Sequence, residues 1–338
     1  MAAQDNPTMQ SGIRMNRMRN LTAFFFYPLP AFSEKQWNFR TEYVIIMLYA
    51  NRYGSAAIGG ASMTYGAAVL LGLIQGIAEF LPISSSGHLA MLQKFLRIGN
   101  LNDHLFFDVL LHLGTLLAVV ITFWGEIRAL WAELLLMLRL RKRPRGKKPD
   151  AARRRMVSFL LVGTLPLALV LPARDAVDSL HDNTFFIGFA LILTGVLLFA
   201  SDRMAHGNKS EKAATLGDAL VVGLAQAVAV VPGLSRSGAT ISTGLLRGFD
   251  RTFAVRFSFL LSIPAVLGAN VVTLVQAIGE GIDWSLLPMY LVGLATAFVS
   301  GFFALYVLRI LTQKGKFGSF AYYCWGAGLL TLILSLIA

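Results

Sequence analysis

Long apolar runs with almost no charge dominate the chain beyond residue 63. They occur at about 105–123, 157–172, 185–201, 253–278, 286–310 and 320–337. Because a helix rises about 1.5 Å per residue, about 20 residues are needed to cross the roughly 30 Å hydrocarbon core of a bilayer. The pattern predicts six transmembrane helices. Those at 157–172 and 185–201 are short and need flanking residues or packing partners to span.

Two further apolar segments, 66–96 and 217–247, do not fit as single crossings. Each begins with about 15 mostly apolar residues, continues into a break rich in Pro, Ser and Gly, and ends in a second short helical stretch. A leg of 15 residues rises only about 22 Å, which is less than the thickness of the hydrocarbon core. We interpret both segments as re-entrant helical hairpins, which enter the membrane and return to the same side.

The two hairpin segments resemble each other at an offset of 151 residues. Residues 72–88 align with 223–239, and the same amino acid stands at seven aligned positions. The pairs are Gly72 and Gly223, Leu73 and Leu224, Gln75 and Gln226, Ala78 and Ala229, Ser84 and Ser235, Ser86 and Ser237, and Gly87 and Gly238. Three predicted crossings separate the hairpins, so the second must enter from the opposite side. The sequence therefore predicts an inverted repeat, about 66–172 and about 217–310, whose broken tips meet near the midplane.

The composition agrees with a polytopic membrane protein. Hydrophobic residues make up 56% of the chain and charged residues 14%, with a mean hydropathy of +0.63. The single cysteine, Cys324, excludes a disulfide framework or a cysteine metal cluster. The net charge of +12 would suggest nucleic acid in a soluble protein, but Lys and Arg concentrate in the loop 124–156. That clustering is a topology signal and indicates no nucleic-acid partner.

The positive-inside rule gives a consistent orientation for six crossings. The basic loop 124–156 is predicted to be cytoplasmic. Counting crossings from it places 279–285 outside, where Glu280 and Asp283 occur without Lys or Arg, and 311–319 inside, where Lys314 and Lys316 lie.

Residues 1–62 have a mixed composition without a clean signal peptide. We interpret them as an N-terminal extension, either disordered or produced by a misassigned start, and 63–338 as a single membrane-embedded domain.

Glu79 is an acidic residue inside the first hairpin, with no cation nearby in the sequence. An ionisable group at membrane depth costs about 2.5–3.5 kcal/mol on insertion scales, so it normally has a partner or a function. Gln75 lies one helical turn earlier on the same face and presents an amide beside the carboxylate. The alternative is a structural Glu79 that snorkels or pairs to hold helices together.

The break after Pro82 carries Ser84, Ser85, Ser86 and His88. Proline ends the first half-helix, and serine hydroxyls can cap the next. Capping accounts for one or two hydroxyls but hardly for all three with an imidazole. The cluster beside Glu79 therefore favours a functional interpretation over a core histidine.

The second tip carries Arg236 between Ser235 and Ser237, with Thr240 one turn later. A guanidinium presents a planar fork of donors that suits phosphate oxygens, and hydroxyls and free N–H groups at a helix start add to it. The tip is predicted to be an anion site. The alternative is a fixed salt bridge from Arg236 to Glu79 without catalysis.

At these two tips the sequence resembles the undecaprenyl-diphosphate phosphatase family, also called bacitracin-resistance proteins. The family's (E/Q)xxxE, PxSSxGH and PGxSRSxxT patterns stand here as residues 75–79, 82–88 and 232–240, and the resemblance runs from about Met63 to the C-terminus. Many relatives have Glu where this chain has Gln75. An amide cannot act as a base, so Glu79 would carry the acid–base role alone.

The resemblance implies hydrolysis of undecaprenyl diphosphate to undecaprenyl phosphate and phosphate in the bacterial inner membrane. That step recycles the lipid carrier for peptidoglycan and confers bacitracin resistance. It also implies a divalent cation, Mg²⁺ or Ca²⁺, with Glu79 and Gln75 as candidate ligands, and a site that opens to the periplasm. The implied catalytic residues are Glu79, Ser85, His88 and Arg236, and the implied diphosphate-binding residues are Ser84, Ser86, Ser235, Arg236, Ser237 and Thr240.

Several alternatives stay open at this point. The nucleophile is Ser85, His88 or an activated water. A transporter or flippase of polyprenyl phosphate would use the same inverted-repeat anion site, and a sequestering factor would bind the lipid diphosphate without turnover. Small-residue stretches at 293–297 and 300–304 allow close helix approach and make a homodimer plausible, although they serve packing within one chain equally well.

Overall fold

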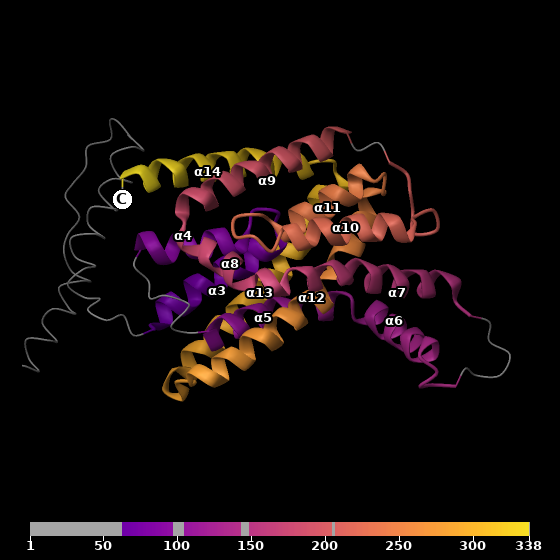
Figure 1. Ribbon diagram of the computed structural model, residues 1–338, viewed down its shortest axis with the longest axis horizontal. Helices are drawn as coiled ribbons and strands as arrows, with labels where there is room; N and C mark the ends of the chain where they lie inside the picture. Colours follow the sequence, from indigo (N-terminus) through magenta and orange to yellow (C-terminus); the bar gives the residue numbers. More distant parts are fainter. Residues whose placement is uncertain (1–62, 97–104, 143–148, 205–206, 338) are drawn as a thin grey trace, which may run out of the picture. The chain divides into compact units, whose positions relative to one another are not determined.

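The computed structural model describes residues 63–96, 105–142, 149–204 and 207–337 (Figure 1). Within these ranges the regular elements are helices, and the only β pairing is a bridge between Lys209 and Phe249. Six helical stretches are long and apolar enough to cross a membrane: Leu105–Thr122, Ala151–Asp182, Thr184–Met204, Arg251–Glu280, Trp284–Gln313 and Phe317–Ile337. The prediction of an all-α, six-span membrane protein is confirmed. The predicted extension 1–62 lies outside the described residues.

The α-helices follow the chain in a simple order. They are α3 (Tyr65–Phe80), α4 (Ser85–Leu96), α5 (Leu105–Thr122), α6 (Trp124–Met137), α7 (Ala151–Thr164), α8 (Arg174–Asp178), α9 (Thr184–Met204), α10 (Leu216–Val228), α11 (Arg236–Leu246), α12 (Arg251–Glu280), α13 (Leu287–Gln313) and α14 (Phe320–Ile337). Polar caps start several of them. Thr64 Oγ1 accepts from Ala67 N at 3.1 Å before α3, and Asp250 Oδ1 accepts from Phe253 N at 2.8 Å before α12.

The predicted span 157–172 is less regular than expected. Helix α7 ends at Thr164, and the chain continues through two short 3₁₀ helices, Leu165–Leu169 and Leu171–Ala173. Pro166 and Pro172 lie in these turns, and proline removes the backbone donor that an α-helix needs. The apolar stretch is therefore completed by short turns and α8 and reaches Asp182.

Two pairs of short helices stand where the sequence predicts broken hairpins. Helix α3 has 16 residues and is followed by α4, and α10 has 13 residues and is followed by α11. The paired elements begin at the predicted offset of 151 residues, Tyr65 with Leu216 and Ser85 with Arg236. The broken helices are therefore present. That they are re-entrant stays a prediction.

The two halves of the chain pack reciprocally. Helix α3 lies along α13, α10 lies along α7, and α9 pairs with α14. A Cβ on Gly72 would lie 2.5 Å from Gly293 O, and one on Gly223 would lie 2.3 Å from Gly163 O. Glycine at these equivalent positions lets each short helix touch the backbone of a helix from the other half. This exchange is the packing expected of an inverted repeat.

The two tips meet inside this arrangement. A Cβ on Gly87, at the start of α4, would lie 3.2 Å from Gly233 Cα, in the turn before α11. The larger hydrophobic core joins α3 to α12, where the rings of Phe80 and Phe259 pack edge to face at 5.7 Å. Packing of the core thus fixes the first turns of α4 and α11 next to each other.

Candidate active site

The same local structure builds both tips. Ser84 Oγ accepts from Gly87 N at 3.3 Å at the start of α4, and Ser235 Oγ accepts from Gly238 N at 3.0 Å at the start of α11. Both hydroxyls are buried and cap their helices. Of the predicted diphosphate-binding residues, Ser84 and Ser235 therefore also have a structural role that accounts for their position.

The backbone at the first tip is strained. Ser84 has a φ of 70°, in the left-handed region that residues other than glycine rarely adopt. At the second tip the residue with a positive φ is a glycine, Gly233, whose φ is 89°. Glycine adopts this conformation without strain. Strained non-glycine residues cluster at functional sites, where surrounding structure holds them.

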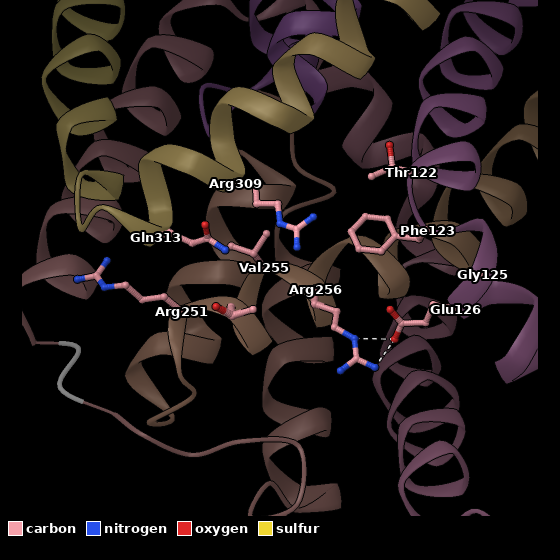
Figure 2. Close-up of a pocket in the computed structure, with 10 residues that line it drawn as sticks. Thr122, Phe123, Gly125, Glu126, Arg251, Val255, Arg256, Arg309 and Gln313 are labelled. Carbon is pink, nitrogen blue, oxygen red and sulfur yellow. Dashed lines mark hydrogen bonds and ion pairs between the residues drawn. The ribbon is translucent and has the colours of Figure 1, made fainter.

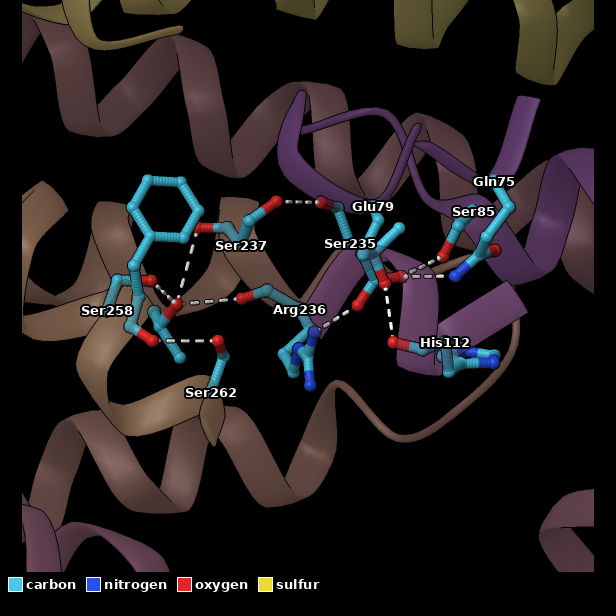
Figure 3. A network of polar contacts seen from close by, with 12 residues as sticks. Gln75, Glu79, Ser85, His112, Ser235, Arg236, Ser237, Ser258 and Ser262 are labelled. Atoms are coloured by element: carbon cyan, nitrogen blue, oxygen red, sulfur yellow. Dashed lines mark hydrogen bonds and ion pairs between the residues drawn. The ribbon is translucent and has the colours of Figure 1, made fainter. Parts of the chain in front are cut away.

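Glu79 lies at the centre of a polar network that draws on both tips (Figure 3). Its Oε1 forms an ion pair with Arg236 Nη2. Its Oε2 accepts from Ser85 Oγ at 2.8 Å and from Gln75 Nε2 at 3.1 Å. Three of the predicted residues thus converge on one buried carboxylate. The pairing of Arg236 with Glu79, weighed above as a structural alternative, is present.

The ion pair leaves part of Arg236 accessible. Its side chain is 24% exposed, whereas that of Glu79 is 7% exposed. A guanidinium has five N–H donors in a fixed fork, and the bond to Glu79 occupies one edge of it. The remaining donors can bind a further acceptor, and Glu79 fixes the position of the guanidinium.

A small cavity of about 10 Å³ adjoins the ion pair, lined by Glu79, Phe80, Arg236, Ser237, Thr240, Ser258, Phe259 and Ser262. It is about large enough for one water molecule. Thr240 Oγ1 lies 2.9 Å from Arg236 O, to which it donates, and 2.5 Å from Ser258 Oγ. Ser237 and Thr240, two of the predicted diphosphate-binding residues, therefore line the cavity beside the ion pair. Ser258 and Ser262 of α12 were missed, although two hydroxyls one turn apart in an apolar run were a usable signal.

His88 faces away from this network. Its Nδ1 lies 2.8 Å from Ser84 O and its Nε2 lies 2.8 Å from the hydroxyl of Tyr323 in α14, against whose ring it stacks. Ser86, the last of the three predicted serines at this tip, has its Oγ 3.4 Å from that of Ser84. Both residues lie in the first turn of α4 with Ser85, but the contacts place only Ser85 on Glu79.

His112 of α5 is a further residue that the sequence reasoning missed. Its Nδ1 lies 3.0 Å from Asp108 O and 3.4 Å from Asp108 Oδ1. Figure 3 shows it on the side of Glu79 opposite Arg236. Asp108 and His112, four residues apart in an otherwise apolar run, were the signal. The site therefore draws on α5 as well as on the two tips.

The residues around Glu79 offer a hard cation two oxygen ligands, one carboxylate and one amide, but no larger ligand cluster among the described residues. Within the described ranges no cluster of three or more His, Cys, Asp or Glu side chains is placed to hold a metal. Gln75 Oε1, however, is buried without a hydrogen-bond partner beside the Glu79 carboxylate. One carboxylate with an amide oxygen fits Mg²⁺, which takes one or two carboxylates and completes its shell with water and substrate phosphate.

The chain is similar over most of its length to known proteins. The family described as bacitracin resistance protein BacA matches residues 68–330. An undecaprenyl-diphosphatase of Halothermothrix orenii is 39% identical over 268 residues, 79% of this chain and 96% of the relative. One of Alkaliphilus metalliredigens is 37% identical over 276 residues, 81% and 100%. One of Korarchaeum cryptofilum is 39% identical over 268 residues, 79% and 98%. The chain is a multi-pass helical membrane protein, and it belongs to the bacitracin resistance protein BacA family.

Proposed function

We propose that this protein hydrolyses undecaprenyl diphosphate to undecaprenyl phosphate and inorganic phosphate. The observation that carries the proposal is the convergence of Ser85, Glu79 and Arg236, a hydroxyl, a base and an anion-binding fork from two separate tips. The names of the family's curated relatives supply the substrate. They do not favour the flippase alternative, and transport of an anion has no use for a hydroxyl paired with a carboxylate.

Ser85 is the nucleophile that the geometry supports best. A nucleophile is activated when it donates to an adjacent base, and Ser85 Oγ donates to Glu79 Oε2 at 2.8 Å. In this mechanism Ser85 Oγ attacks the terminal phosphorus as its proton passes to Glu79. The anhydride P–O bond breaks, undecaprenyl phosphate leaves, and water then hydrolyses the phosphoserine to restore Ser85 and release phosphate.

Arg236 neutralises the negative charge of the transferring phosphoryl group. Phosphoryl transfer depends on charge stabilisation and in-line positioning more than on other chemistry. The N–H groups at the starts of α4 and α11 add positive potential at the same place. A Mg²⁺ or Ca²⁺ ion, as a Lewis acid on the phosphate oxygens, would be held by Glu79 and Gln75 Oε1. His88, with Tyr323, would lie at the edge of the site and exchange protons with the substrate or solvent.

The membrane setting is proposed from charge and helix length. The segment 124–156, predicted as a loop, contains α6 and the start of α7. It would be cytoplasmic, the two broken helix pairs re-entrant, and the site open to the periplasmic side of the bacterial inner membrane. In that setting the activity recycles the lipid carrier for peptidoglycan and supports resistance to bacitracin. A homodimer is a further proposal, but the small residues of α13 do not form its surface, because Gly293, Ala297 and Ser300 are buried within the chain against α3.

The test is phosphate release from farnesyl or undecaprenyl diphosphate by the purified protein with Mg²⁺ or Ca²⁺. Ser85→Ala and Glu79→Gln are expected to lower kcat by about 100- to 10,000-fold, the usual contribution of a general base or its nucleophile. Ser319→Ala and Glu211→Gln, the same changes away from the site, are expected to retain full activity. An inert wild type that still binds the lipid would instead support the sequestering alternative.

Mass spectrometry of rapidly quenched protein separates the nucleophiles. A phosphate on the peptide that contains Ser85 supports the covalent mechanism. A phosphate on His88 would contradict it, and full activity of Ser85→Ala without any phosphopeptide would assign the attack to water.

A further inference from the structure

A second cavity, of about 340 Å³, lies where the end of α5, the start of α6, the start of α12 and the end of α13 meet (Figure 2). Three arginines line it, Arg251, Arg256 and Arg309, against one acidic residue, Glu126. It shares no lining residue with the cavity beside Glu79. It is therefore a separate, basic pocket at helix ends rather than part of the proposed active site.

Ion pairs hold two of the arginines in place. Arg256 donates from Nε to Glu126 Oε1 at 2.6 Å and from Nη1 to Glu211 Oε2 at 3.0 Å, and Arg251 pairs with Asp202. Figure 2 shows the pair of Arg256 and Glu126 on the wall of the pocket. These contacts preorganise the wall by holding two guanidinium groups against three carboxylates.

Arg309 differs from the other two. Its side chain is exposed in the last turns of α13, and it forms no ion pair or hydrogen bond with another residue of the described ranges. Figure 2 shows its guanidinium directed toward the space between Phe123 and Arg256. Gln313, one turn later, lines the same pocket and adds a neutral amide. The pocket therefore contains one guanidinium that pairs with no carboxylate of the described ranges, and its planar fork of donors matches phosphate oxygens.

The surroundings of the pocket are those of a membrane surface. Phe123 and Val255 give it apolar walls. Trp124 is 57% exposed beside it at the start of α6, and Tyr306 is 63% exposed one turn before Arg309. Exposed Trp and Tyr are typical of the depth at which lipid headgroups lie. A ligand that fits must therefore carry an anionic group together with an apolar chain.

We propose that this pocket binds the phosphate group of a membrane lipid. Arg309 contacts the phosphate, the paired Arg256 borders it, and the lipid chain leaves along Phe123 into the bilayer. Basic pockets between transmembrane helices are known to take lipid headgroups of this kind. A volume of about 340 Å³ is within the range of about 300–1,000 Å³ found for small-ligand sites. The proposal does not depend on the proposed hydrolysis.

Native mass spectrometry of the full chain in detergent tests it. The probes are phosphatidylglycerol, farnesyl phosphate, zwitterionic phosphatidylcholine and inorganic phosphate. The variants are Arg309→Gln and the matched control Lys316→Gln, which removes one positive charge just beyond the same helix. Because Arg309 has no partner within the described ranges, its variant is expected to fold, which an unchanged unfolding midpoint verifies.

Because Arg309→Gln loses a charge-assisted contact, its affinity for one lipid phosphate is expected to fall about tenfold. The affinity of Lys316→Gln is expected to equal that of wild type. Whether phosphatidylglycerol or farnesyl phosphate shows the loss identifies the source. An equal loss of affinity in both variants would mean that binding depends on surface charge alone, which would overturn the proposal. Arg309-dependent binding of inorganic phosphate as tight as that of either lipid would also overturn it.

Discussion

The most quantitative prediction concerns Asp218, a fully buried carboxylate at the start of α10 and outside the six spans. Lys209 Nζ lies 3.0 Å from its Oδ2 and Arg247 Nη2 lies 2.8 Å from its Oδ1. Thr215 donates to it from both N and Oγ1 at 3.0 Å. These donors tie the start of α10 to the end of α11 and to the loop before them. They lower the pKa of Asp218 from its ordinary value of 3.8 to about 2, against the opposing effect of burial.

The lowered pKa gives both a magnitude and a sign. At about 1.4 kcal/mol per pKa unit, the folded state gains about 2 kcal/mol from ionised Asp218 at neutral pH. Because the folded-state pKa lies below the unfolded one, this gain is complete above about pH 4 and disappears as the pH falls toward 2. Asp218→Asn removes the charge and leaves Lys209 and Arg247 without their counter-ion. Its unfolding midpoint in detergent is expected to fall by roughly 4–8 °C at pH 7.

The assay is a thermal unfolding series of both proteins from pH 7 to pH 2.5. The difference between wild type and Asp218→Asn should be constant down to about pH 4 and should then shrink as wild type also loses the charge. Asp175→Asn, an exposed change on α8, should match wild type at every pH. A difference that stays the same at pH 2.5, or no difference at pH 7, would refute the ion-pair reasoning.

Three further outcomes follow from contacts elsewhere. Gly76→Ala should destabilise the protein by about 1–3 kcal/mol or prevent its folding, because the new Cβ would lie 1.9 Å from Ser300 Oγ. Gly326 has open space around it, so Gly326→Ala should leave the stability unchanged. The unfolding midpoints of the two variants test this difference. Cys324 is fully buried, so a maleimide should label it only after denaturation, and rapid labelling of the native protein would contradict the packing of α14. Tyr323→Phe removes the hydroxyl that contacts His88 Nε2, and it should change the pH profile of phosphate release more than the KM if His88 exchanges protons during turnover.

The local patterns of the sequence predicted much of the fold. The apolar runs became the six long helical stretches, since a bilayer requires length and low charge of any helix that crosses it. The breaks appeared at Pro82 and near Pro232, with Ser84 and Ser235 capping the helices that follow. The irregular course after Thr164 was missed, although Pro166 in the same run was visible.

The site was predicted in its members but not in its contacts. Glu79 and Arg236 each stood out as an ionisable residue in an apolar segment, yet 157 residues separate them. His112 was overlooked because it lies within an ordinary span rather than at a tip. His88 was grouped with Ser85 by sequence distance, whereas the turn of α4 directs it to Tyr323 instead.

The sequence by itself determined where helices run and break and which residue types gather at each tip, because those properties depend on hydrophobicity, proline and capping within a few neighbouring residues. Only the tertiary structure decided that Glu79 binds Ser85 and Arg236 together and that Arg309 lines a basic pocket. Such contacts depend on the distance between helices. Here that distance follows from backbone approach at glycines such as Gly72 and Gly223, whose partners lie far away in the chain.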